Sequence, residues 1–231
     1  HEFRPRRSLD EDCMSEIELI YGDCFEVLKT IPDKSIAVSF TSPPYNRKRN
    51  DKYKFHDDCI DDYYSFLCKF TDELIRVSYR NVFINIQKNY YNKKEVHKWI
   101  GQYSDQIYEN FIWLKSNPMP ANGKNITNSY EYIVCFGKWL KSNKTYTKNS
   151  IITSVASMHK EHKAIMHQEV SDYFVGNFTQ DGDTILDPFG GLMTTGISAH
   201  KFNRNFIGIE KEKEYYEIAK SRLNERGIKL K

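Results

Sequence analysis

The sequence predicts an α/β fold with a mostly parallel sheet that is covered by helices on both faces. Short apolar runs typical of buried strands alternate with longer segments in which apolar residues recur at helical spacing. A glycine-rich turn lies between the strand at 184–187 and the start of a helix, and the next strand, at 206–210, ends in an acid. Together these features are typical of a doubly wound, Rossmann-like sheet.

The individual elements follow from periodicity and from turn residues. In the first half we expect strands at 17–20, 35–40 and 82–86, and helices at 25–30, 63–77 and 93–103. In the second half we expect strands at 107–114, 130–136, 184–187 and 206–210, and helices at 170–178 and 212–223. The strands at 107–114 and 130–136 are joined by a long loop, which predicts an antiparallel hairpin at the edge of the sheet.

Length and composition place limits on the class of protein. With 231 residues, the chain can form one domain with a sizeable core, over 17–231, after a polar segment at 1–16 that we interpret as a flexible tail or a cloning remnant. No apolar run is long enough for a membrane span, and no secretory segment is evident. The five cysteines are scattered without C-x-x-C spacing, which favours reduced thiols in an intracellular protein. No metal site is predicted, because the histidines at 159, 162 and 167 lack supporting Cys or acidic ligands.

The most distinctive stretch is Ser42-Pro43-Pro44-Tyr45, which directly follows the strand at 35–40. Two prolines lack the backbone donors that a sheet needs, so the chain must leave the sheet at Ser42. A rigid corner of this kind suits a site that binds a flat polar ring, with hydrogen bonds at the ring's edge and stacking on its face. An ordinary exit from a strand into a loop remains the alternative.

A second stretch, from Asp187 to Thr195, contains the glycine turn, and the strand after it ends at Glu210. This is the layout of a nucleotide-type site, in which glycines permit close backbone approach and the acid binds ribose hydroxyls. The sequence lacks G-x-G-x-x-G and a Walker lysine, so the binding of phosphate is not indicated, and a nicotinamide-dependent dehydrogenase is disfavoured.

Together the two stretches resemble the amino-directed DNA methyltransferases, which use S-adenosylmethionine. Residues 42–45 are similar to the family's catalytic (D/N/S)-P-P-(Y/F/W) motif, and 187–195 to its cofactor motif, D-P-F-x-G-x-G-T-T. The catalytic motif comes first, which is the permuted order of the β group. Met193 stands where the family usually has glycine, and a methionine is costly there if the backbone needs a positive φ.

The resemblance implies a role for each matching residue. Ser42 and the Pro43 carbonyl would accept hydrogen bonds from the exocyclic amine of a flipped base that stacks on Tyr45, and Pro44 completes the corner. The implied cofactor-binding residues are Asp23, Cys24, His162, Asp187, Phe189, Gly190, Gly191, Thr194, Thr195 and Glu210. Asp23 can also cap the helix at 25–30, and His162 is the only match to a His-Pro segment of the family.

Basic residues in two places suggest contacts with DNA. After the corner, Arg47, Lys48, Arg49, Lys52 and Lys54 are interleaved with aromatic residues that include Tyr53. Further along, Lys141, Lys144 and Lys148 lie within a segment near 138–160, where the family places target recognition. Each run could instead be a solvated surface. The second segment is too short for a recognition domain, which leaves open a homodimer or an additional targeting domain or subunit.

The resemblance therefore predicts a DNA methyltransferase in which the amine attacks the methyl group directly. No Pro-Cys pair is present to supply a cysteine nucleophile. Serine at the first motif position favours N4 of cytosine, whereas Asn46 after the tyrosine is frequent in enzymes that methylate N6 of adenine. An RNA methyltransferase and an inactive nucleic-acid-binding module are the more distant alternatives.

Overall fold

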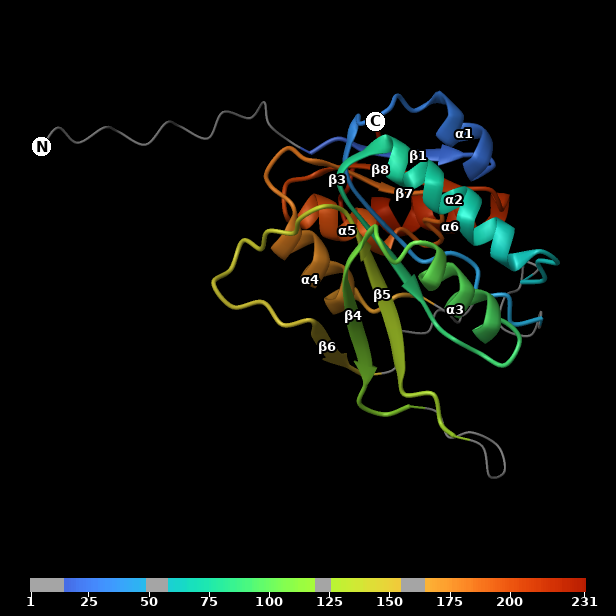
Figure 1. Cartoon of the computed structure of the whole chain (residues 1–231). Helices are drawn as coiled ribbons and strands as arrows, with labels where there is room; N and C mark the ends of the chain where they lie inside the picture. Colours follow the sequence, from blue (N-terminus) through green and yellow to red (C-terminus); the bar gives the residue numbers. More distant parts are fainter. Residues whose placement is uncertain (1–14, 49–57, 119–125, 155–164) are drawn as a thin grey trace, which may run out of the picture.

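The computed structural model describes residues 15–48, 58–118, 126–154 and 165–231. It contains an eight-stranded sheet in the order β1-β8-β7-β2-β3-β5-β4-β6 (Figure 1). The strands are β1 (Ile17–Tyr21), β2 (Ile36–Thr41), β3 (Ser78–Ile86), β4 (Ile107–Lys115), β5 (Tyr130–Phe136), β6 (Ser150–Thr153), β7 (Thr184–Asp187) and β8 (Asn205–Glu210). The helices are α1 (Cys24–Thr30), α2 (Tyr63–Val77), α3 (Lys93–Gln102), α4 (Gln168–Phe178), α5 (Thr194–Lys201) and α6 (Lys213–Asn224).

The sheet is mostly parallel, as the sequence predicts. Only β5 runs against its neighbours, since it pairs antiparallel with both β3 and β4. The expected hairpin of β4 and β5 is therefore confirmed, but it is not the outermost part of the sheet. The unexpected strand β6 pairs in parallel with β4 and forms the edge. It has only four residues, of which two are buried, and this is too short a pattern to stand out in the sequence.

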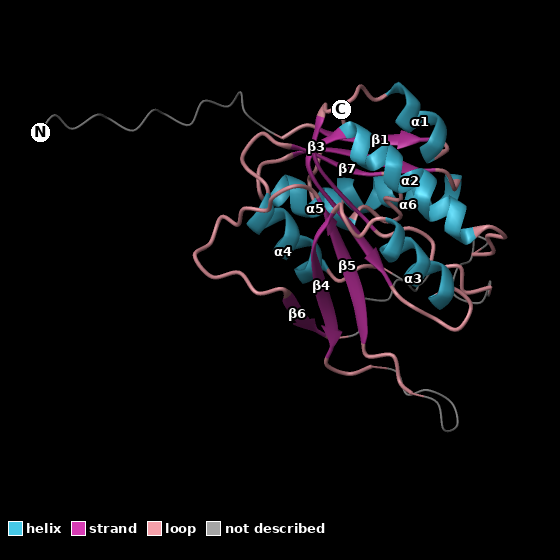
Figure 2. Ribbon diagram, viewed as in Figure 1, coloured by secondary structure: helices cyan, strands magenta, loops and turns pink. Residues whose placement is uncertain are grey.

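Helices cover both faces of the sheet, giving three layers (Figure 2). On one face α1, α2 and α3 pack against the middle strands, around buried side chains such as Leu67, Phe70 and Trp99. On the other face α4 packs against β2, β3, β4 and β5 through Phe174, while α5 and α6 cover β1, β7 and β8. The amphipathic patterns that predicted these helices thus correspond to their buried faces.

The two central strands carry the two sequence motifs. β2 pairs in parallel with β7, although the strands are far apart in the sequence. After β2 the chain passes through α2 to β3 on one side, and after β7 it passes through α5 to β8 on the other side. In a doubly wound sheet, a crevice opens at the carboxyl ends of strands where the connections diverge in this way. The fold therefore brings residues 42–45 and 187–195 to one place.

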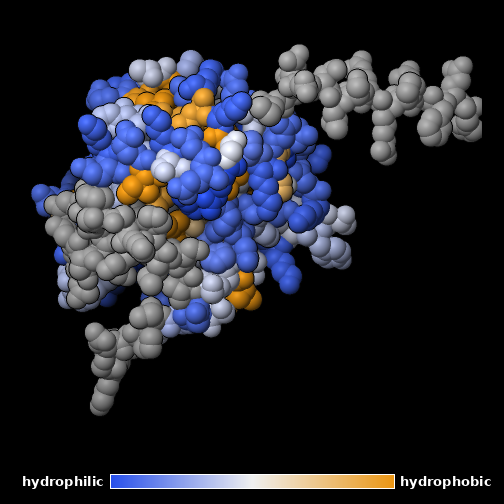
Figure 3. All heavy atoms as spheres, turned by 180° about the vertical axis from the view of Figure 1, so that it is seen from behind, coloured by the Kyte–Doolittle hydropathy of each residue, from blue (hydrophilic) through white to orange (hydrophobic). Residues whose placement is uncertain are grey.

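The start of the described chain contacts the domain. Glu16 donates its backbone N–H to the Asn205 side chain at 2.9 Å and accepts a hydrogen bond from the Phe206 backbone at 2.8 Å. Residues 1–14, most of the segment expected as a tail, lie outside the described residues. Within the described ranges, no helix is both long and apolar enough to cross a membrane. Hydrophilic side chains occupy most of the coloured surface in Figure 3.

Candidate active site

The corner after β2 is fixed by hydrogen bonds to its backbone carbonyl groups. The hydroxyl of Tyr63, on α2, donates to the Pro44 carbonyl at 2.7 Å. The side-chain amides of Asn89 and Asn92, which follow β3, donate to the Tyr45 carbonyl at 2.8 and 2.7 Å. These donors come from two separate elements, so the corner that the two prolines begin is held rigidly by the rest of the fold.

The side chains of the corner join a buried polar network. The Ser42 Oγ and Tyr45 Oη atoms are 2.7 Å apart, and the Tyr45 hydroxyl donates to Glu131 Oε2 at 2.9 Å. The amide of Asn85, on β3, donates to Tyr45 Oη at 2.7 Å and to Glu131 Oε2 at 2.9 Å. Lys115, on β4, forms an ion pair with the other oxygen of Glu131. Tyr45 is consequently buried, with 7% of its surface exposed.

Asn46 continues the corner with a left-handed backbone, at φ 50°. Asparagine tolerates this conformation better than most residues. Its side chain donates to the Ile60 carbonyl and accepts from the Ile60 N–H, both at 2.9 Å, and its own N–H donates to Asp58 at 2.8 Å. Asn46 thus ties the corner to the segment that leads into α2.

On the other side of the cavity, Asp187 ends β7, and its carboxylate accepts three hydrogen bonds. Its Oδ1 accepts from the Thr41 hydroxyl at 2.7 Å and from the Phe189 N–H at 3.2 Å, while Oδ2 accepts from the Thr195 hydroxyl at 3.0 Å. Burial raises the pKa of Asp187 to about 6, although these hydrogen bonds oppose the rise. Asp187 thereby locks the end of β2 to the glycine turn, a bracing role that the resemblance did not suggest.

Glu210 ends β8 beside the same turn. Its Oε2 accepts from the Gly191 N–H at 3.0 Å, and its Oε1 accepts from the Glu212 N–H at 2.8 Å. Burial raises the pKa of this carboxyl group, and the two backbone donors oppose the rise. Because each carboxylate oxygen has two acceptor positions, Glu210 can still accept two further hydrogen bonds, such as those from a pair of ribose hydroxyls.

Met193 does adopt the positive φ that the sequence analysis treats as costly, at φ 57°. Its side chain is fully buried in the core under α5 and α6, and Met193 does not itself line the cavity. A Cβ atom at Gly190 would lie 2.2 Å from Met193 Cε, and one at Gly208 would lie 2.5 Å from Met193 Sδ. The methionine therefore fills space that two glycines leave open, and the turn keeps its shape without the usual glycine.

The start of α1 forms a third part of the site. Asp23 caps this helix, because its Oδ1 accepts from the Phe25 N–H at 2.8 Å. The expected capping role is thus confirmed, and the residue also borders the cavity. Next to it, burial raises the pKa of the Cys24 thiol to about 12, so the thiol stays protonated near neutral pH.

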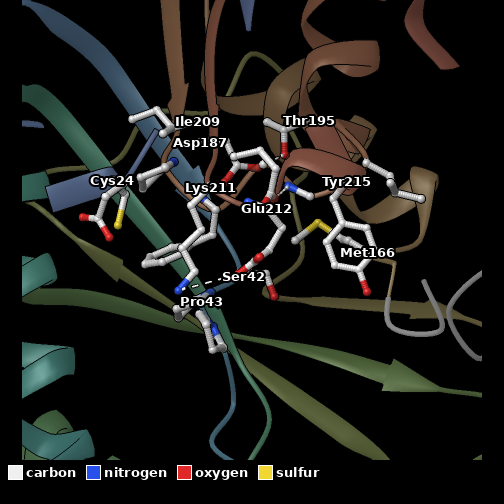
Figure 4. A pocket seen from close by; sticks show the side chains of 18 of the residues that line it. Cys24, Ser42, Pro43, Met166, Asp187, Thr195, Ile209, Lys211, Glu212 and Tyr215 are labelled. Atoms are coloured by element: carbon white, nitrogen blue, oxygen red, sulfur yellow. Dashed lines mark hydrogen bonds and ion pairs between the residues drawn. The ribbon is translucent and has the colours of Figure 1, made fainter. Parts of the chain in front are cut away.

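The corner, the glycine turn and the start of α1 surround one cavity of about 390 Å³. In Figure 4, Ser42 and Pro43 lie on one side of it, and Asp187 and Thr195 lie on the opposite side. The predicted site residues that line the cavity are Asp23, Cys24, Ser42, Pro43, Pro44, Tyr45, Asp187, Phe189, Gly190, Gly191, Thr194, Thr195 and Glu210. Ile165 and Met166, which follow the expected His-Pro-like segment at His162, also line the cavity, as does Tyr215, which was not anticipated. The predicted His162 lies outside the described residues.

The basic residues expected to contact DNA divide into groups. Arg47 borders the corner, with its guanidinium carbon 5.6 Å from the centre of the Tyr45 ring, and Lys48 is exposed beside it. The continuation of this run, at Arg49, Lys52, Tyr53 and Lys54, lies outside the described residues, as do residues 155–160 of the expected recognition segment.

The lysines of the 138–160 segment do not meet the corner. Lys141, Lys144 and Lys148 are exposed, and none of them lines the cavity. Their neighbour Asn143 bonds to the carbonyl of Asn177 at the end of α4, near the edge where the parallel strands begin. The structure thus places Lys141 and Lys144 near the amino-terminal ends of the parallel strands, whereas Ser42 lies at the carboxyl-terminal end of β2.

Sequence reasoning missed the residues that support the corner. Asn85 and Glu131 are polar positions within apolar strands, in the runs VFINI and YEYIVCF, and both are buried. A polar residue inside a buried strand must find a partner, and this was the one indication that the sequence offered. Within the described ranges, no group of three or more His, Cys, Asp or Glu residues could hold a metal ion.

Solved structures share this fold. The PvuII DNA methyltransferase (cytosine-N4-specific) superposes with a TM-score of 0.76 at 19% identity, covering 90% of this chain and 86% of that one. M1.HpyAVI in its complex with SAM gives a TM-score of 0.68 at 24% identity, covering 90% of this chain and 100% of that one. A putative DNA modification methylase from Thermus thermophilus, complexed with S-adenosyl-L-methionine, gives 0.66 at 22% identity, covering 94% of this chain and 98% of that one.

Similar proteins also appear at the level of sequence. The type II methyltransferase M.MwoI of Methanothermobacter wolfeii is 29% identical over 92% of this chain, and M.HinfI of Haemophilus influenzae is 28% identical over 90%. The chain spans only 35% of the length of the first and 68% of the second. A DNA methylase family model, for N6- and N4-directed enzymes, matches residues 36–221, which include both motifs. The chain therefore belongs to this DNA methylase family.

Proposed function

We propose that this chain transfers the methyl group of S-adenosylmethionine to an exocyclic amine in DNA, and that the amine is N4 of cytosine. The observation that carries the proposal is the single cavity, which extends from Glu210 and the glycine turn to Ser42 and Tyr45. A cofactor bound along the turn would present its reactive end to the corner. Members of the same family act on amino groups of DNA bases, which fits that arrangement.

The chemistry of the lining fits S-adenosylmethionine. Glu210 retains acceptor positions for ribose hydroxyls, Phe189 and Ile209 provide apolar walls for a flat base, and Asp23 and Glu212 add negative charge for a cationic ligand. When bound, the cofactor supplies a methyl group that is activated by a positively charged sulfur. Two of the structurally similar proteins are themselves described as complexes with this molecule.

The corner would hold the target amine for direct attack. A base inside a duplex cannot reach a cavity of this kind, so the base has to leave the helix. The Tyr45 ring would stack on it, and Ser42 Oγ and the Pro43 carbonyl would accept hydrogen bonds from the amine. Alignment of the amine lone pair then supplies much of the rate. Cys24, with its pKa raised to about 12, offers no thiolate for covalent catalysis.

The choice of cytosine rests on Ser42 and on the role of Asn46. Serine at the first motif position favours N4 of cytosine. Asn46 is the residue that favoured adenine, but its left-handed backbone and its two bonds to Ile60 give it a structural reason to be asparagine. The main argument for adenine is therefore weakened, and N6 of adenine becomes an outcome of the test.

A basic and aromatic surface beside the corner supports DNA as the substrate. Lys88 follows β3, and its Nζ lies 4.8 Å from the centre of the Tyr132 ring on the adjacent β5. Tyr90 is 80% exposed nearby in sequence, and Arg47 flanks Tyr45. Cations neutralise phosphates and exposed rings stack on bases. Because this chain spans only 35% of the length of M.MwoI, we include a further targeting domain or subunit in the proposal.

The deciding experiment is nucleoside mass spectrometry of DNA incubated with the protein and labelled S-adenosylmethionine, with the Ser42→Ala variant as control. Labelled N4-methylcytosine formed by the wild type alone would support the proposal. Labelled N6-methyladenine would replace the base and leave the rest unchanged. Label that enters RNA in preference to DNA would contradict the DNA substrate. Cofactor binding without transfer to either would favour an inactive binding module.

A further inference from the structure

The ion pair of Glu131 and Lys115 lies directly behind the catalytic corner. Glu131, on β5, is 4% exposed, and its two oxygens face different partners. One oxygen, Oε2, accepts from the Tyr45 hydroxyl and the Asn85 amide, and the other faces the ammonium group of Lys115 on β4. A buried carboxylate is costly unless it is paired and hydrogen-bonded, so a purely structural strand position would favour an apolar residue.

The network fixes the direction of every hydrogen bond in it. An ionised carboxylate can only accept, so the single proton of the Tyr45 hydroxyl must point at Glu131. The Asn85 group that faces Glu131 must likewise be its NH₂, which also donates to Tyr45 Oη and lies 3.3 Å from Ser42 Oγ, again as a donor. The bond between Ser42 Oγ and Tyr45 Oη, at 2.7 Å, can then have only one donor, which is Ser42.

This direction has a consequence for catalysis. A serine hydroxyl has one proton and two acceptor lone pairs. With its proton committed to Tyr45, Ser42 can only accept further hydrogen bonds, and the long contact from Asn85 leaves it a lone pair for the proposed amine. We propose that the charge of Glu131, paired with Lys115, makes Glu131 a positioning residue that holds Ser42 in the acceptor state. The inference rests on the proposed function and adds two residues to it.

The Glu131→Gln variant tests the direction of the chain of hydrogen bonds. Lys115 can only donate, so the new amide must turn its oxygen to Lys115 and its NH₂ to Tyr45. With the Asn85 amide in its present orientation, Tyr45 would then accept from both NH₂ groups and donate its own proton to Ser42, which loses acceptor capacity for the amine. We expect kcat to fall by about 10- to 100-fold, the size of a lost hydrogen bond to a charged group. The KM for S-adenosylmethionine should stay within about threefold, because the cofactor turn is untouched.

A second variant separates direction from simple damage to the structure. In the double variant Glu131→Gln/Lys115→Met, the amide oxygen is no longer drawn to an ammonium group. It can face Tyr45 and restore the original direction, so kcat should recover by about tenfold relative to the single variant. If Glu131 and Lys115 only support the fold, the double variant should be no better than the single one. The Glu217→Gln variant, on the exposed face of α6, controls for the same chemical change elsewhere.

A binding measurement removes the dependence on turnover. Two oligonucleotides are titrated in the presence of sinefungin, a non-reactive cofactor analogue. One carries the unmodified target base, as identified by mass spectrometry, and the other carries an analogue of that base without the exocyclic amine. The wild type should prefer the amine-bearing base, Glu131→Gln should lose most of that preference, and the double variant should regain it. An unchanged preference in Glu131→Gln would overturn the inference while leaving the proposed function intact. A wild type that methylates no DNA would overturn the proposed function, and the inference with it.

Discussion

The turn after β7 and the corner after β2 lie side by side, but they are held by contacts of different range. Apart from the bond from Thr41 to Asp187, the carboxylates of the turn are bound by groups at most 19 residues away. Apart from Ser42, the hydrogen-bond partners of Tyr45 named above are between 40 and 86 residues away, on β3, β5 and the segment after β3. One side of the cavity is built locally, and the other is assembled by the sheet.

This difference separates what each side should control. The local turn can keep its shape as long as β7, α5 and β8 are in place, so changes there should affect cofactor affinity and stability. The corner depends on side chains from several strands, so changes there should affect the chemical step. The predictions below test this division, beginning with the largest expected effect.

The Ser42→Ala variant should lose methyl transfer and keep cofactor binding. Ser42 faces the cavity but does not contact the glycine turn, and its loss removes an acceptor for the target amine. We expect single-turnover rates to fall on the order of 10²-fold or more, as when one aligned polar group is removed from other active sites. Isothermal titration with S-adenosylmethionine should give an unchanged Kd. A Kd that weakens as much as the rate would show that the two sides are not separate.

The Asp187→Asn variant should change how stability depends on pH. Because the pKa of Asp187 is about 6 in the folded protein and has an ordinary value of 3.8, the folded state binds more protons between these two values. The contribution of this group to stability is therefore full below about pH 4 and is lost as the pH rises through 6. The loss is about 3 kcal/mol, at about 1.4 kcal/mol for each pH unit.

Urea unfolding of the wild type and of Asp187→Asn between pH 4 and pH 7 measures this directly. The difference between their free energies of unfolding should move in favour of the variant as the pH rises. A difference that stays constant over the range would mean that the buried carboxylate does not titrate there, and that its three hydrogen bonds fully offset its burial.

The contrast in range also explains what could be predicted from the sequence. Apart from β6, the strands were found within a few residues of their positions, as were the helices, because apolar periodicity records burial on one face. The glycine turn and Glu210 could also be found, because most of their contacts are made with residues nearby in the sequence. The order of the strands, by contrast, was not predicted, because it depends on pairings between segments that are far apart in the sequence.

The supports of the corner were beyond this reasoning. Nothing near Tyr45 in the sequence points to Glu131 or Asn85, because their meeting depends on the register between β3 and β5. Strand β6 was missed since it gains its stability from β4 and not from its own four residues. The assignment of Asp187 to the cofactor stays a prediction, and the sequence motif did not show that Thr41, Phe189 and Thr195 already bond to its carboxylate.

The Glu210→Gln variant should weaken cofactor binding and leave the corner intact. Glutamine keeps one acceptor oxygen but places an NH₂ group against either the Gly191 or the Glu212 N–H, where no donor fits. We expect the Kd for S-adenosylmethionine to rise about 10-fold, in line with the loss of a hydrogen bond to a charged group. At saturating cofactor the rate of methyl transfer should recover most of its wild-type value. The exposed Glu214→Gln variant is the matched control.

The Met193→Leu variant should have the smallest effect, because the side chain belongs to the core and not to the cavity. Leucine is close to methionine in volume and meets the same left-handed backbone at φ 57°. Such exchanges usually cost less than about 1.5 kcal/mol, and here the cost comes from repacking against Gly190 and Gly208. Thermal unfolding should register this loss, while the Kd for S-adenosylmethionine should not change measurably. A clear loss of cofactor affinity with little loss of stability would instead place residue 193 on the cavity side of the turn, and would show that the local half of the site is more sensitive to its core than its short-range hydrogen bonds suggest.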